Sequence, residues 1–382
     1  MSGMKICTYV YPVWHEIQER AELYGAGWTE WQLLNERTRL YGSHQLTAPP
    51  LWGCYDDTQE KDVQRQIQTA LKYGVDAFIY LYYWSPSGIQ LKSALDTYLA
   101  VSQGTEHQFA LIWPLRNCRR VVKRPLNSQR DYEADREFEI TSKDVHRFFE
   151  ETIEQFFLKK NYLCVDGSPV LYLYKYYDFI EHLGESCFRS CIQNANELLK
   201  RKGFQGLYLV GCTERHPDEE TDVSNLGFKA LSSYVLLPDF HRGPPIQDYQ
   251  GRISEKFLWV DQYQKNTGIP YLNSIPVGFD ASSRGEAGIE VPSSLGEKND
   301  YPWFPIVENL SVEVFKEYFK KGLGRALEKN LPLLNVASWN EWTQGHVLEP
   351  DEKLRFSYLE AIREVKKHQI KASIDSGFRG VS

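Results

Sequence analysis

The sequence lacks the patterns that identify several common protein classes. No stretch approaches the roughly 18 consecutive apolar residues that a membrane-spanning helix requires, and the start of the chain, Met1 to Cys7, has no apolar signal core. The seven cysteines include no Cys-x-x-Cys pair, which disfavours a zinc ribbon and a disulfide framework and suits a reducing compartment. We therefore expect a cytoplasmic protein without a transmembrane segment.

Motifs for cofactor chemistry are also missing. There is no G-x-G-x-x-G, P-loop, G-x-S-x-G or H-E-x-x-H pattern, and the histidines are scattered, so we expect no cofactor and no metal site. The formal net charge is −7, and the basic residues near Arg116 are isolated in an acidic chain, so no nucleic-acid partner is expected. No Gly-, Ser- or Pro-rich linker interrupts the sequence, and we expect residues 1–382 to form a single domain.

Aromatic side chains, in contrast, are plentiful. The 10 tryptophans and 24 tyrosines fit either a large core or a groove whose flat apolar faces bind sugars. Short β-branched and aromatic runs alternate with longer segments of helical period, which is typical of repeated βα units. The eight expected strands are Ile6–Tyr11, Ala77–Tyr83, Phe109–Trp113, Val170–Tyr174, Leu207–Gly211, Ala230–Ser233, Tyr271–Ile275 and Leu333–Ala337.

Helices are expected between these strands. One of them, Glu185–Lys202, has apolar residues at i, i+3, i+4 and i+7 spacing and should end at Gly203. The others are expected at Thr58–Tyr73, Ile89–Val101, Thr141–Lys159, Val312–Lys329 and Arg355–Lys367, with weaker ones near 222–226 and 253–265.

Eight strands that are each followed by a helix predict a (β/α)₈ barrel, with an open doubly wound sheet as the alternative. The long connections 12–57, 114–140 and 276–310 follow the first, third and seventh strands, so they are expected to be βα loops. In a barrel these loops form the active face at the carboxyl ends of the strands.

Polar side chains crowd behind the last expected strand. Asn340, Glu341, Trp342, Gln344 and Glu349 all lie within a dozen or so residues of its end, and we expect them to form part of a site. The alternative is that Asn340 and Glu341 cap a helix and that the tryptophans of this segment belong to the core.

Two further loops carry candidate residues. The segment behind the first strand offers Tyr11, His15, Trp28 and Glu30, although a lone His15 or Glu30 could equally be structural. Behind the seventh strand, Asp280 and Arg284 either bind a ligand or form an internal ion pair. Carboxylates in an aromatic setting, without other catalytic motifs, favour glycosyl transfer or hydrolysis.

These segments together resemble a known family, the WbsX-like proteins of bacterial surface-polysaccharide clusters. Those proteins share a barrel with glycoside hydrolase family 99, the endo-α-mannosidases. The resemblance covers nearly all of the chain. It rests on Tyr11-Pro-Val-Trp-His15, Gly27-Trp-Thr-Glu-Trp31, Gly53-Cys-Tyr-Asp56, Tyr73-Gly-Val-Asp-Ala-Phe78, Tyr82-Tyr-Trp84, Asp166-Gly-Ser-Pro-Val170, Pro276-Val-Gly-Phe-Asp280 with Arg284, and Trp339-Asn-Glu-Trp342 through Leu348-Glu-Pro350.

The resemblance implies a (β/α)₈ fold and two carboxylates, three residues apart, behind the last strand. The first deprotonates the sugar's own 2-hydroxyl, which attacks the anomeric carbon, and it corresponds to Glu341. The second serves as acid and then base, and it corresponds to Gln344. An amide cannot donate a proton to a leaving alkoxide at neutral pH, so this chain departs from the family at its acid.

A second departure follows the third strand, where related proteins tend to have Trp-Ala-Asn-Glu and this chain has Trp113-Pro-Leu-Arg116. Arg116, with Arg119 and Arg120, would suit an anionic group such as a donor phosphate, an acidic sugar or a sulfate. The alternative is that these arginines pair with nearby acids such as Asp131, Glu133 or Asp135.

We therefore expect a WbsX-like glycosyltransferase that acts on a surface-polysaccharide glycan, with an activated sugar donor as a second partner. Glu341 would stand nearest the anomeric centre, while His15, Glu30 and Asp280 would position sugar hydroxyls. Arg284 would fix Asp280 or the ligand. Trp28, Trp84, Trp113 and Trp342 would offer stacking faces. Two alternatives stay open: an endo-acting α-glycoside hydrolase whose acid comes from elsewhere, for example Glu349, Glu30 or a residue of the third loop, and a glycan-binding protein without activity.

Overall fold

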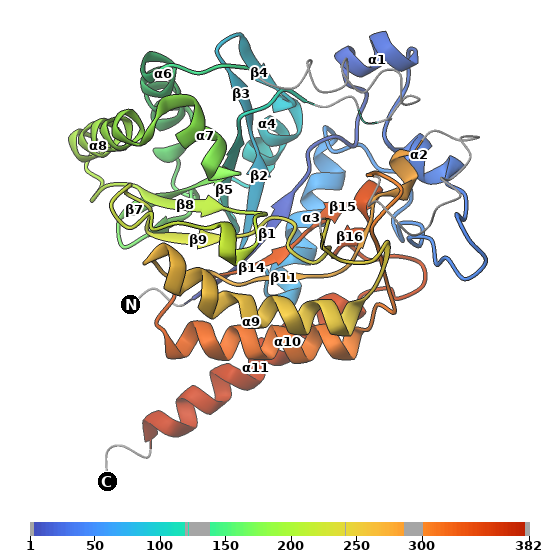
Figure 1. The fold of residues 1–382 in the computed structure, drawn as a ribbon. Coiled ribbons are helices and arrows are strands. Elements are labelled where there is room, and N and C mark those ends of the chain that lie inside the picture. The colour runs from blue at the N-terminus through green and yellow to red at the C-terminus, as the bar shows by residue number, and fades with distance from the viewer. Residues whose placement is uncertain (1–3, 119–120, 122–137, 241, 286–300, 379–382) are drawn as a thin grey trace.

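The computed structural model describes residues 4–118, 121, 138–240, 242–285 and 301–378, and its side chains up to residue 369. Eight parallel strands surround a central core, and helices cover the outside of the sheet (Figure 1). The strands are β1 (Lys5–Val10), β2 (Ala77–Leu81), β5 (Gln108–Pro114), β7 (Ser168–Tyr174), β8 (Tyr208–Cys212), β9 (Ala230–Ser232), β11 (Ser274–Pro276) and β14 (Leu333–Ala337).

The sheet closes into a barrel. Its ladders run in the order β11, β14, β1, β2, β5, β7, β8, β9, and every neighbouring pair is parallel. The ends of this order meet just before β11, where Leu231 of β9 bridges Tyr271 and its backbone bonds Pro270 and Leu272 at 2.8 Å each. The predicted (β/α)₈ barrel is therefore confirmed, and the open-sheet alternative is wrong.

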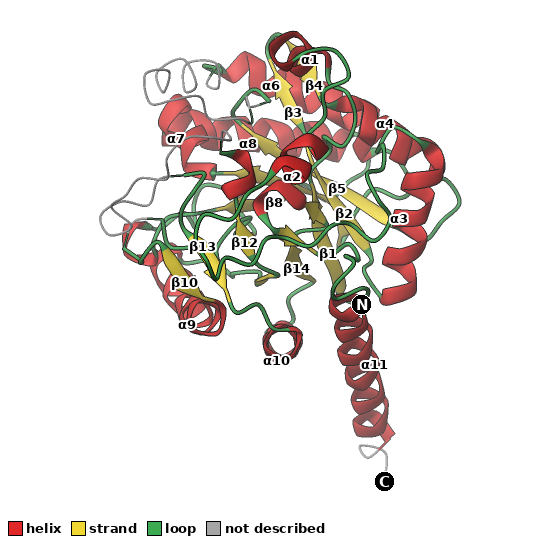
Figure 2. Ribbon diagram, turned by 90° about the vertical axis from the view of Figure 1, so that its right-hand side faces the viewer, coloured by secondary structure: helices red, strands yellow, loops and turns green. Residues whose placement is uncertain are grey.

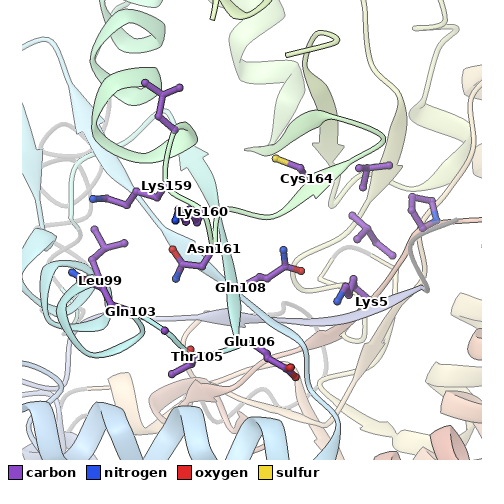
Figure 3. Close-up of a pocket in the computed structure, with 15 residues that line it drawn as sticks. Lys5, Leu99, Gln103, Thr105, Glu106, Gln108, Lys159, Lys160, Asn161 and Cys164 are labelled. Atoms are coloured by element: carbon purple, nitrogen blue, oxygen red, sulfur yellow. The ribbon is translucent and has the colours of Figure 1, made fainter. Parts of the chain in front are cut away.

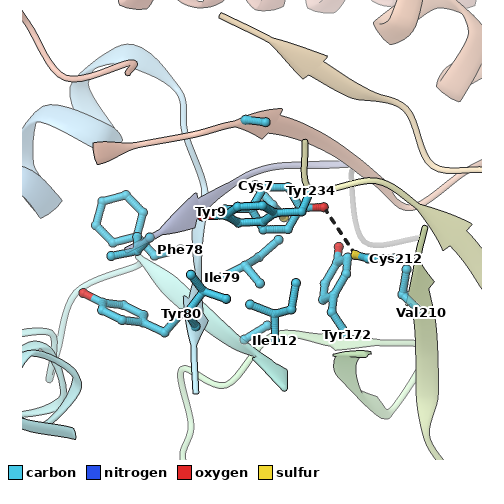
Figure 4. Packing of buried hydrophobic residues seen from close by; sticks show 14 of the residues in the cluster. Cys7, Tyr9, Phe78, Ile79, Tyr80, Ile112, Tyr172, Val210, Cys212 and Tyr234 are labelled. Carbon is cyan, nitrogen blue, oxygen red and sulfur yellow. Dashed lines mark hydrogen bonds between the residues drawn. The ribbon is translucent and has the colours of Figure 1, made fainter. Parts of the chain in front are cut away.

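The barrel interior is filled by side chains rather than by solvent. Tyr9, Ile79, Ile112 and Tyr172 point inward from four different strands and are at most 2% exposed (Figure 4). The buried hydroxyl of Tyr9 donates to the backbone carbonyl of Ser233 at 3.1 Å, so its polar group is satisfied. Strands that bury both faces read as continuous apolar runs, which is why the sequence located all eight.

Helices fill most of the connections. Thr141 begins one of them with a capping box to Asp144, and the α-helix then runs into a π-helical turn at Ile153–Phe157. Gly203, with φ of +91°, follows the end of α8 as predicted. The helices are α1 (Gln18–Tyr24), α2 (Trp31–Glu36), α3 (Glu60–Tyr73), α4 (Lys92–Val101), α6 (Ser142–Thr152), α7 (Tyr176–Leu183), α8 (Glu185–Arg201), α9 (Tyr249–Thr267), α10 (Val312–Glu328) and α11 (Ser357–Phe378).

Two helix predictions need correction. The segment Ile89–Val101 is not helical at its start, because Ile89 lies in β4 (Gly88–Gln90), which pairs with β3 (Tyr83–Ser85) in a hairpin. Residues 222–226 form coil and a turn instead of a helix. The sequence prediction also missed α1, α2 and α7, which are 7, 6 and 8 residues long.

Several short strands are present besides the eight of the barrel. β6 (Cys164–Val165) pairs with β7, and β10 (Ile246–Asp248), β12 (Phe279–Asp280) and β13 (Ile306–Glu308) form a small separate sheet. β15 (Asn340–Glu341) and β16 (His346–Val347) form a hairpin behind β14. In Figure 2, α2 lies over the barrel and α11 projects away from it. Across residues 4–378, wherever the structure is described, no helix is both long and apolar enough to span a bilayer.

Candidate active site

The segment that follows the carboxyl end of β14 carries several of the candidate residues. The chain leaves this strand through the β15–β16 hairpin, in which Glu341 pairs with His346, and the intervening residues Trp342–Gln344 form a 3₁₀ turn. Gly345 closes the turn with φ of +64°, and a Cβ there would lie 2.9 Å from the backbone nitrogen of Asp280. A glycine is therefore required at this position, because both the conformation and the space exclude a side chain.

Glu341 is buried and held on both oxygens. It is 2% exposed, its Oε2 accepts from the Tyr234 hydroxyl at 2.6 Å, and its Oε1 accepts from Arg284 Nη2 at 2.8 Å. Burial raises the pKa of Glu341 above its ordinary value, while Arg284 and Tyr234 oppose part of that increase. The side chain makes no cap hydrogen bond, so the capping alternative is wrong for Glu341.

Arg284 joins Glu341 to a second buried carboxylate, Glu30. Arg284 Nη2 lies 3.7 Å from Glu30 Oε2, which also accepts from the Thr343 hydroxyl at 2.7 Å. Glu30 Oε1 accepts from Tyr11 Oη at 2.7 Å and pairs with Arg20. Burial favours the neutral acid, but Arg20 and Arg284 outweigh it and hold the pKa of Glu30 below its ordinary value. Glu30 is therefore ionised at neutral pH.

Gln344 is linked to Arg284 through the hydroxyl oxygen of Tyr301. Its Nε2 donates to the Tyr301 hydroxyl oxygen at 3.1 Å, and Arg284 Nη1 donates to that oxygen at the same distance. Gln344 Oε1 lies 3.0 Å from Nε2 of His346, whose Nδ1 lies 3.1 Å from the Ser338 hydroxyl. Burial, with a smaller contribution from Arg284, lowers the pKa of His346 to about 3. A neutral His346 thus donates one proton, which fits the amide oxygen of Gln344.

His15 and Asp280 each pair with a residue that the sequence analysis did not select. His15 Nδ1 lies 2.6 Å from Asp57 Oδ1; burial lowers the pKa of His15, but the hydrogen bond and charge of Asp57 raise it overall. Asp280 Oδ2 lies 3.0 Å from His44 Nε2. The alternative of an internal ion pair between Asp280 and Arg284 is therefore wrong, because Arg284 turns toward the two buried glutamates.

Asn340 and Glu349 are bound by protein groups. Asn340 Oδ1 accepts from the backbone N–H of Tyr11 at 2.8 Å. Glu349 is 2% exposed and accepts from Tyr55 and Trp342 at 2.8 Å and from Gln66 at 2.9 Å. Burial raises the pKa of Glu349 to about 8, although these donors oppose the change. Both residues join the hairpin to the rest of the barrel.

Three of the four candidate tryptophans have no ring open to solvent. Trp84, Trp113 and Trp342 are each 1% exposed. Trp113 stacks on Phe148 with ring centroids 3.7 Å apart and meets Trp84 edge to face at 5.5 Å. The core alternative holds for Trp342, and the structure gives no stacking face at these three positions. Trp28 is half-buried and packs against Tyr24 at 4.4 Å.

Arg116 lies on the same face of the barrel. Its guanidinium is 4.7 Å above the ring of Tyr174, which meets Tyr234 edge to face at 5.6 Å. Among the described residues, its nearest carboxylate is that of Asp178 at 3.9 Å, and its buried Nε has no hydrogen-bond partner there. Arg119, Arg120, Asp131, Glu133 and Asp135 lie outside the described residues.

The sequence analysis missed several residues of this network. Tyr234, Tyr301, Arg20, Thr343 and Asp57 all contact a candidate side chain. Tyr234 lies two residues beyond the end of β9, so a search for polar residues at every strand end would have found it. Thr343 lies between two selected residues in the 3₁₀ turn Trp342–Gln344. Tyr301, Arg20 and Asp57 lie deeper in long connections, where spacing along the sequence gives no indication of contact.

A large cavity lies at the opposite end of the barrel (Figure 3). It has a volume of about 890 Å³ and is lined by the first residues of three strands, Lys5, Gln108 and Leu333, and by Lys159 and Lys160. Active sites of such barrels lie at the carboxyl ends of the strands. This cavity is therefore separate from the network around Glu341.

Comparison with sequences identifies the family. The profile described as "Glycosyltransferase WbsX" matches residues 6–268 and 304–362, which is most of the chain. The protein WxcX of Xanthomonas campestris pv. campestris (strain B100), named as uncharacterized, is 23% identical over 379 residues, covering 94% of this chain and 49% of that protein. The chain thus spans about half the length of the curated relatives it matches, which include WxcX of strain ATCC 33913.

Comparison with solved structures shows the fold. A family 99 endo-α-mannosidase of Bacteroides thetaiotaomicron, in complex with bis-tris-propane, has a TM-score of 0.61 at 13% identity, covering 97% of this chain and 98% of that one. A glycoside hydrolase-like protein has a TM-score of 0.56 at 12% identity, covering 96% and 94%. At these identities the likeness establishes the barrel alone.

Proposed function

Because this chain belongs to the WbsX glycosyltransferase family, we propose that it transfers a sugar from an activated donor to a bacterial surface glycan. The reaction takes place at the carboxyl end of the barrel, with the Glu341 carboxylate nearest the anomeric carbon. Glu341 stabilises the positive charge that develops there as the donor's leaving group departs. Arg284 and Tyr234 fix the carboxylate in place through its two oxygens.

The observation that carries this proposal is the amide at position 344. Gln344 stands where the family resemblance expects an acid, and both ends of its amide are hydrogen-bonded, to Tyr301 and to His346. Loss of a general acid costs about 10²–10⁴-fold for a leaving group that needs a proton. A phosphate leaves as a stable anion, so a phosphate-activated donor is the substrate class that tolerates Gln344.

The two other carboxyl groups named as acids for hydrolysis are poorly suited to that role. Glu30 is ionised at neutral pH, since Arg20 and Arg284 lower its pKa, and it has no proton to give. Glu349 is protonated at neutral pH, but its oxygens face Tyr55, Gln66 and Trp342 rather than Arg284 or Gln344. Transfer from an activated donor is therefore favoured over ordinary hydrolysis.

Other side chains of this face would hold the substrates. Arg116 would meet the donor phosphate, because its nearest carboxylate among the described residues is 3.9 Å away and Tyr174 and Tyr234 connect it to Glu341. His15 and Asp280, which Asp57 and His44 orient, would bind sugar hydroxyls. The half-buried ring of Trp28 would be the stacking face.

The test uses sugar fluorides, because fluoride leaves without the help of an acid. The sugars are α-mannosyl fluoride, chosen because the family 99 neighbours are named endo-α-mannosidases, and α-glucosyl fluoride as the comparison. We expect the native protein to release fluoride and to transfer the sugar to an added saccharide. We expect Gln344→Glu to gain hydrolysis of a p-nitrophenyl glycoside of the same sugar.

Calorimetric titration with each sugar fluoride supplies the control for binding. If both proteins bind a fluoride and neither releases it, the proposal is wrong and the protein is a glycan-binding member of the family. Hydrolysis of an unactivated oligosaccharide by the native protein would instead identify a hydrolase with an acid other than Gln344.

A further inference from the structure

We propose that the imidazole of His15 is the general base of this transfer and takes the proton of the acceptor hydroxyl. The inference rests on the proposed function, since it concerns a glycosyl transfer centred on Glu341. It gives His15 a catalytic role beyond a hydrogen bond to a sugar, and it makes Asp57 the positioning residue of that base.

The reaction needs a base even though it needs no acid. The donor phosphate leaves as a stable anion, but the acceptor hydroxyl must lose its proton when its oxygen bonds to the anomeric carbon. Gln344 stands where the family resemblance expects the carboxylate that serves as acid and base, and an amide cannot take up this proton at neutral pH. Another side chain must therefore be the base.

The two buried glutamates of the network are held by protein donors. Both oxygens of Glu341 accept hydrogen bonds, from Tyr234 at 2.6 Å and from Arg284 at 2.8 Å. Glu30 is 0% exposed, and each of its oxygens accepts from a protein hydroxyl at 2.7 Å. A base for the acceptor is better placed on a group whose nitrogen or oxygen has no protein partner.

His15 has the arrangement of such a base. Its Nδ1 lies 2.6 Å from Asp57 Oδ1, and the two side chains are 9% and 5% exposed. A carboxylate at Nδ1 fixes the ring and leaves the lone pair of the neutral imidazole on Nε2. Among the described residues Nε2 has no hydrogen-bond partner, and it is not one of the unpartnered polar atoms that the fold buries completely. Its lone pair is therefore left for a ligand.

The loop of His15 is tied to the segment that carries Glu341. The indole N–H of Trp14 donates to the backbone carbonyl of Asn340 at 3.0 Å. The backbone N–H of Trp14 donates to Asp57 Oδ2 at 3.1 Å. Asn340 directly precedes Glu341 in the chain, so these bonds hold the histidine and the glutamate at the same, carboxyl end of the barrel.

Two other histidines of this face have both ring nitrogens bonded. His44 lies between Asp280 at 3.0 Å and the backbone N–H of Leu40 at 3.2 Å. His346 also has a partner at each nitrogen, at 3.0 and 3.1 Å. Of these three histidines, His15 alone keeps a ring nitrogen without a partner among the described residues.

Atoms and charges balance without an acid. The bond between the anomeric carbon and the phosphate oxygen of the donor breaks, and the electron pair leaves with the phosphate. The acceptor oxygen forms the new bond to the anomeric carbon, and its proton passes to His15 Nε2. The imidazolium, which the Asp57 carboxylate stabilises, then gives the proton to water.

The experiment compares two acceptors in His15→Asn. Asparagine keeps an amide N–H for Asp57 near the position of Nδ1 but cannot take up a proton. The donor is the sugar fluoride that the native protein turns over, and the acceptors are a saccharide, which must lose a proton, and azide, which has none to lose. We expect saccharide transfer to fall by about 10²–10⁴-fold while glycosyl azide formation keeps its native rate.

The pH dependence gives a second readout that does not need azide. Burial and the charge of Arg20 lower the pKa of His15, but Asp57 and Asp56 raise it overall, above the ordinary 6.5. The base acts when it is neutral, so saccharide transfer by the native protein should fall as the pH drops through this raised pKa. In Asp57→Asn the fall should move to lower pH, and in His15→Asn it should be absent from this range.

Two controls separate the possible causes. His182→Asn changes an exposed histidine of α7 and should leave the rates with both acceptors as they are. Thermal unfolding of each variant checks the fold. An equal loss with saccharide and azide in His15→Asn, or an acid-side fall that Asp57→Asn does not move, would make His15 a binding residue and overturn the inference. Absence of fluoride release by the native protein would instead overturn the proposed function, and this inference with it.

Discussion

Replacement of Glu349 by glutamine should make the protein less sensitive to alkaline pH. Glu349 is 2% exposed, and burial raises its pKa from 4.5 to about 8 although three protein groups donate to it. A group with a raised folded pKa contributes stability below its unfolded pKa and loses it as the pH rises through the folded pKa. The native protein should therefore lose stability between pH 4.5 and about 8.

The size of this loss follows from the two pKa values. The interval from 4.5 to about 8, at about 1.4 kcal/mol for each pKa unit, corresponds to about 5 kcal/mol. Glutamine has nearly the same shape and no titrating proton. The substitution also changes the unfolding free energy by a constant amount, because the new amide nitrogen faces one of the three donors. This constant part does not depend on pH.

The assay is urea unfolding of the native protein and of Glu349→Gln, at pH values from about 5 to about 9. We expect the difference in unfolding free energy to shift in favour of the variant by several kcal/mol across this range. Fluoride release by Glu349→Gln should stay close to that of the native protein, since the proposed reaction does not use the Glu349 carboxyl group. Parallel pH profiles would refute the reasoning about its burial.

Three other substitutions test the charged network. Arg284→Met leaves Glu341 and Glu30 without their shared cation and should cost about 3–5 kcal/mol of unfolding free energy, measured in urea. Glu30→Gln should destabilise by a similar amount at neutral pH; because the folded pKa of Glu30 is lowered, this difference should vanish as the pH falls through that pKa. Asp57→Asn should lower the pKa of His15, which an NMR titration of the ring would detect.

Much of the fold could be predicted because the barrel strands are buried on both faces. The run Phe109–Trp113 is at most 1% exposed along its length, and such a strand reads as an unbroken apolar segment. Short elements gave no comparable signal: α2, with 6 residues, is shorter than the window in which helical period can be recognised. The helix expected from Ile89 started too early, because Ile89 lies in the short β3–β4 hairpin.

The membership of the site could be predicted in part, but its pairings could not. The barrel brings the loops behind β1, β11 and β14 together, so Glu30, Arg284 and Glu341 meet as the sequence suggested. Which charge each arginine contacts depends on loop geometry. Asp280 is four residues from Arg284 and still pairs with His44, 236 residues away in the sequence.

The tryptophans show a second limit of sequence reasoning. An aromatic residue at a strand end can face a substrate or face a covering helix, and composition does not distinguish the two. Trp113 lies against Phe148 of α6 at a centroid distance of 3.7 Å, so a helix covers its ring where a sugar was expected. The apolar face of the predicted helix at Thr141–Lys159 was the signal that could have indicated this contact.

The most direct test concerns the carboxylate of Glu341. The measurement is the rate of sugar transfer from the glycosyl fluoride to a saccharide acceptor by the native protein and by Glu341→Gln. Calorimetric titration and thermal unfolding show in parallel that both proteins bind the fluoride and are folded. We predict that the substitution lowers the rate by about 10²–10⁴-fold while binding is kept. An unchanged rate would contradict the placement of Glu341 at the anomeric centre.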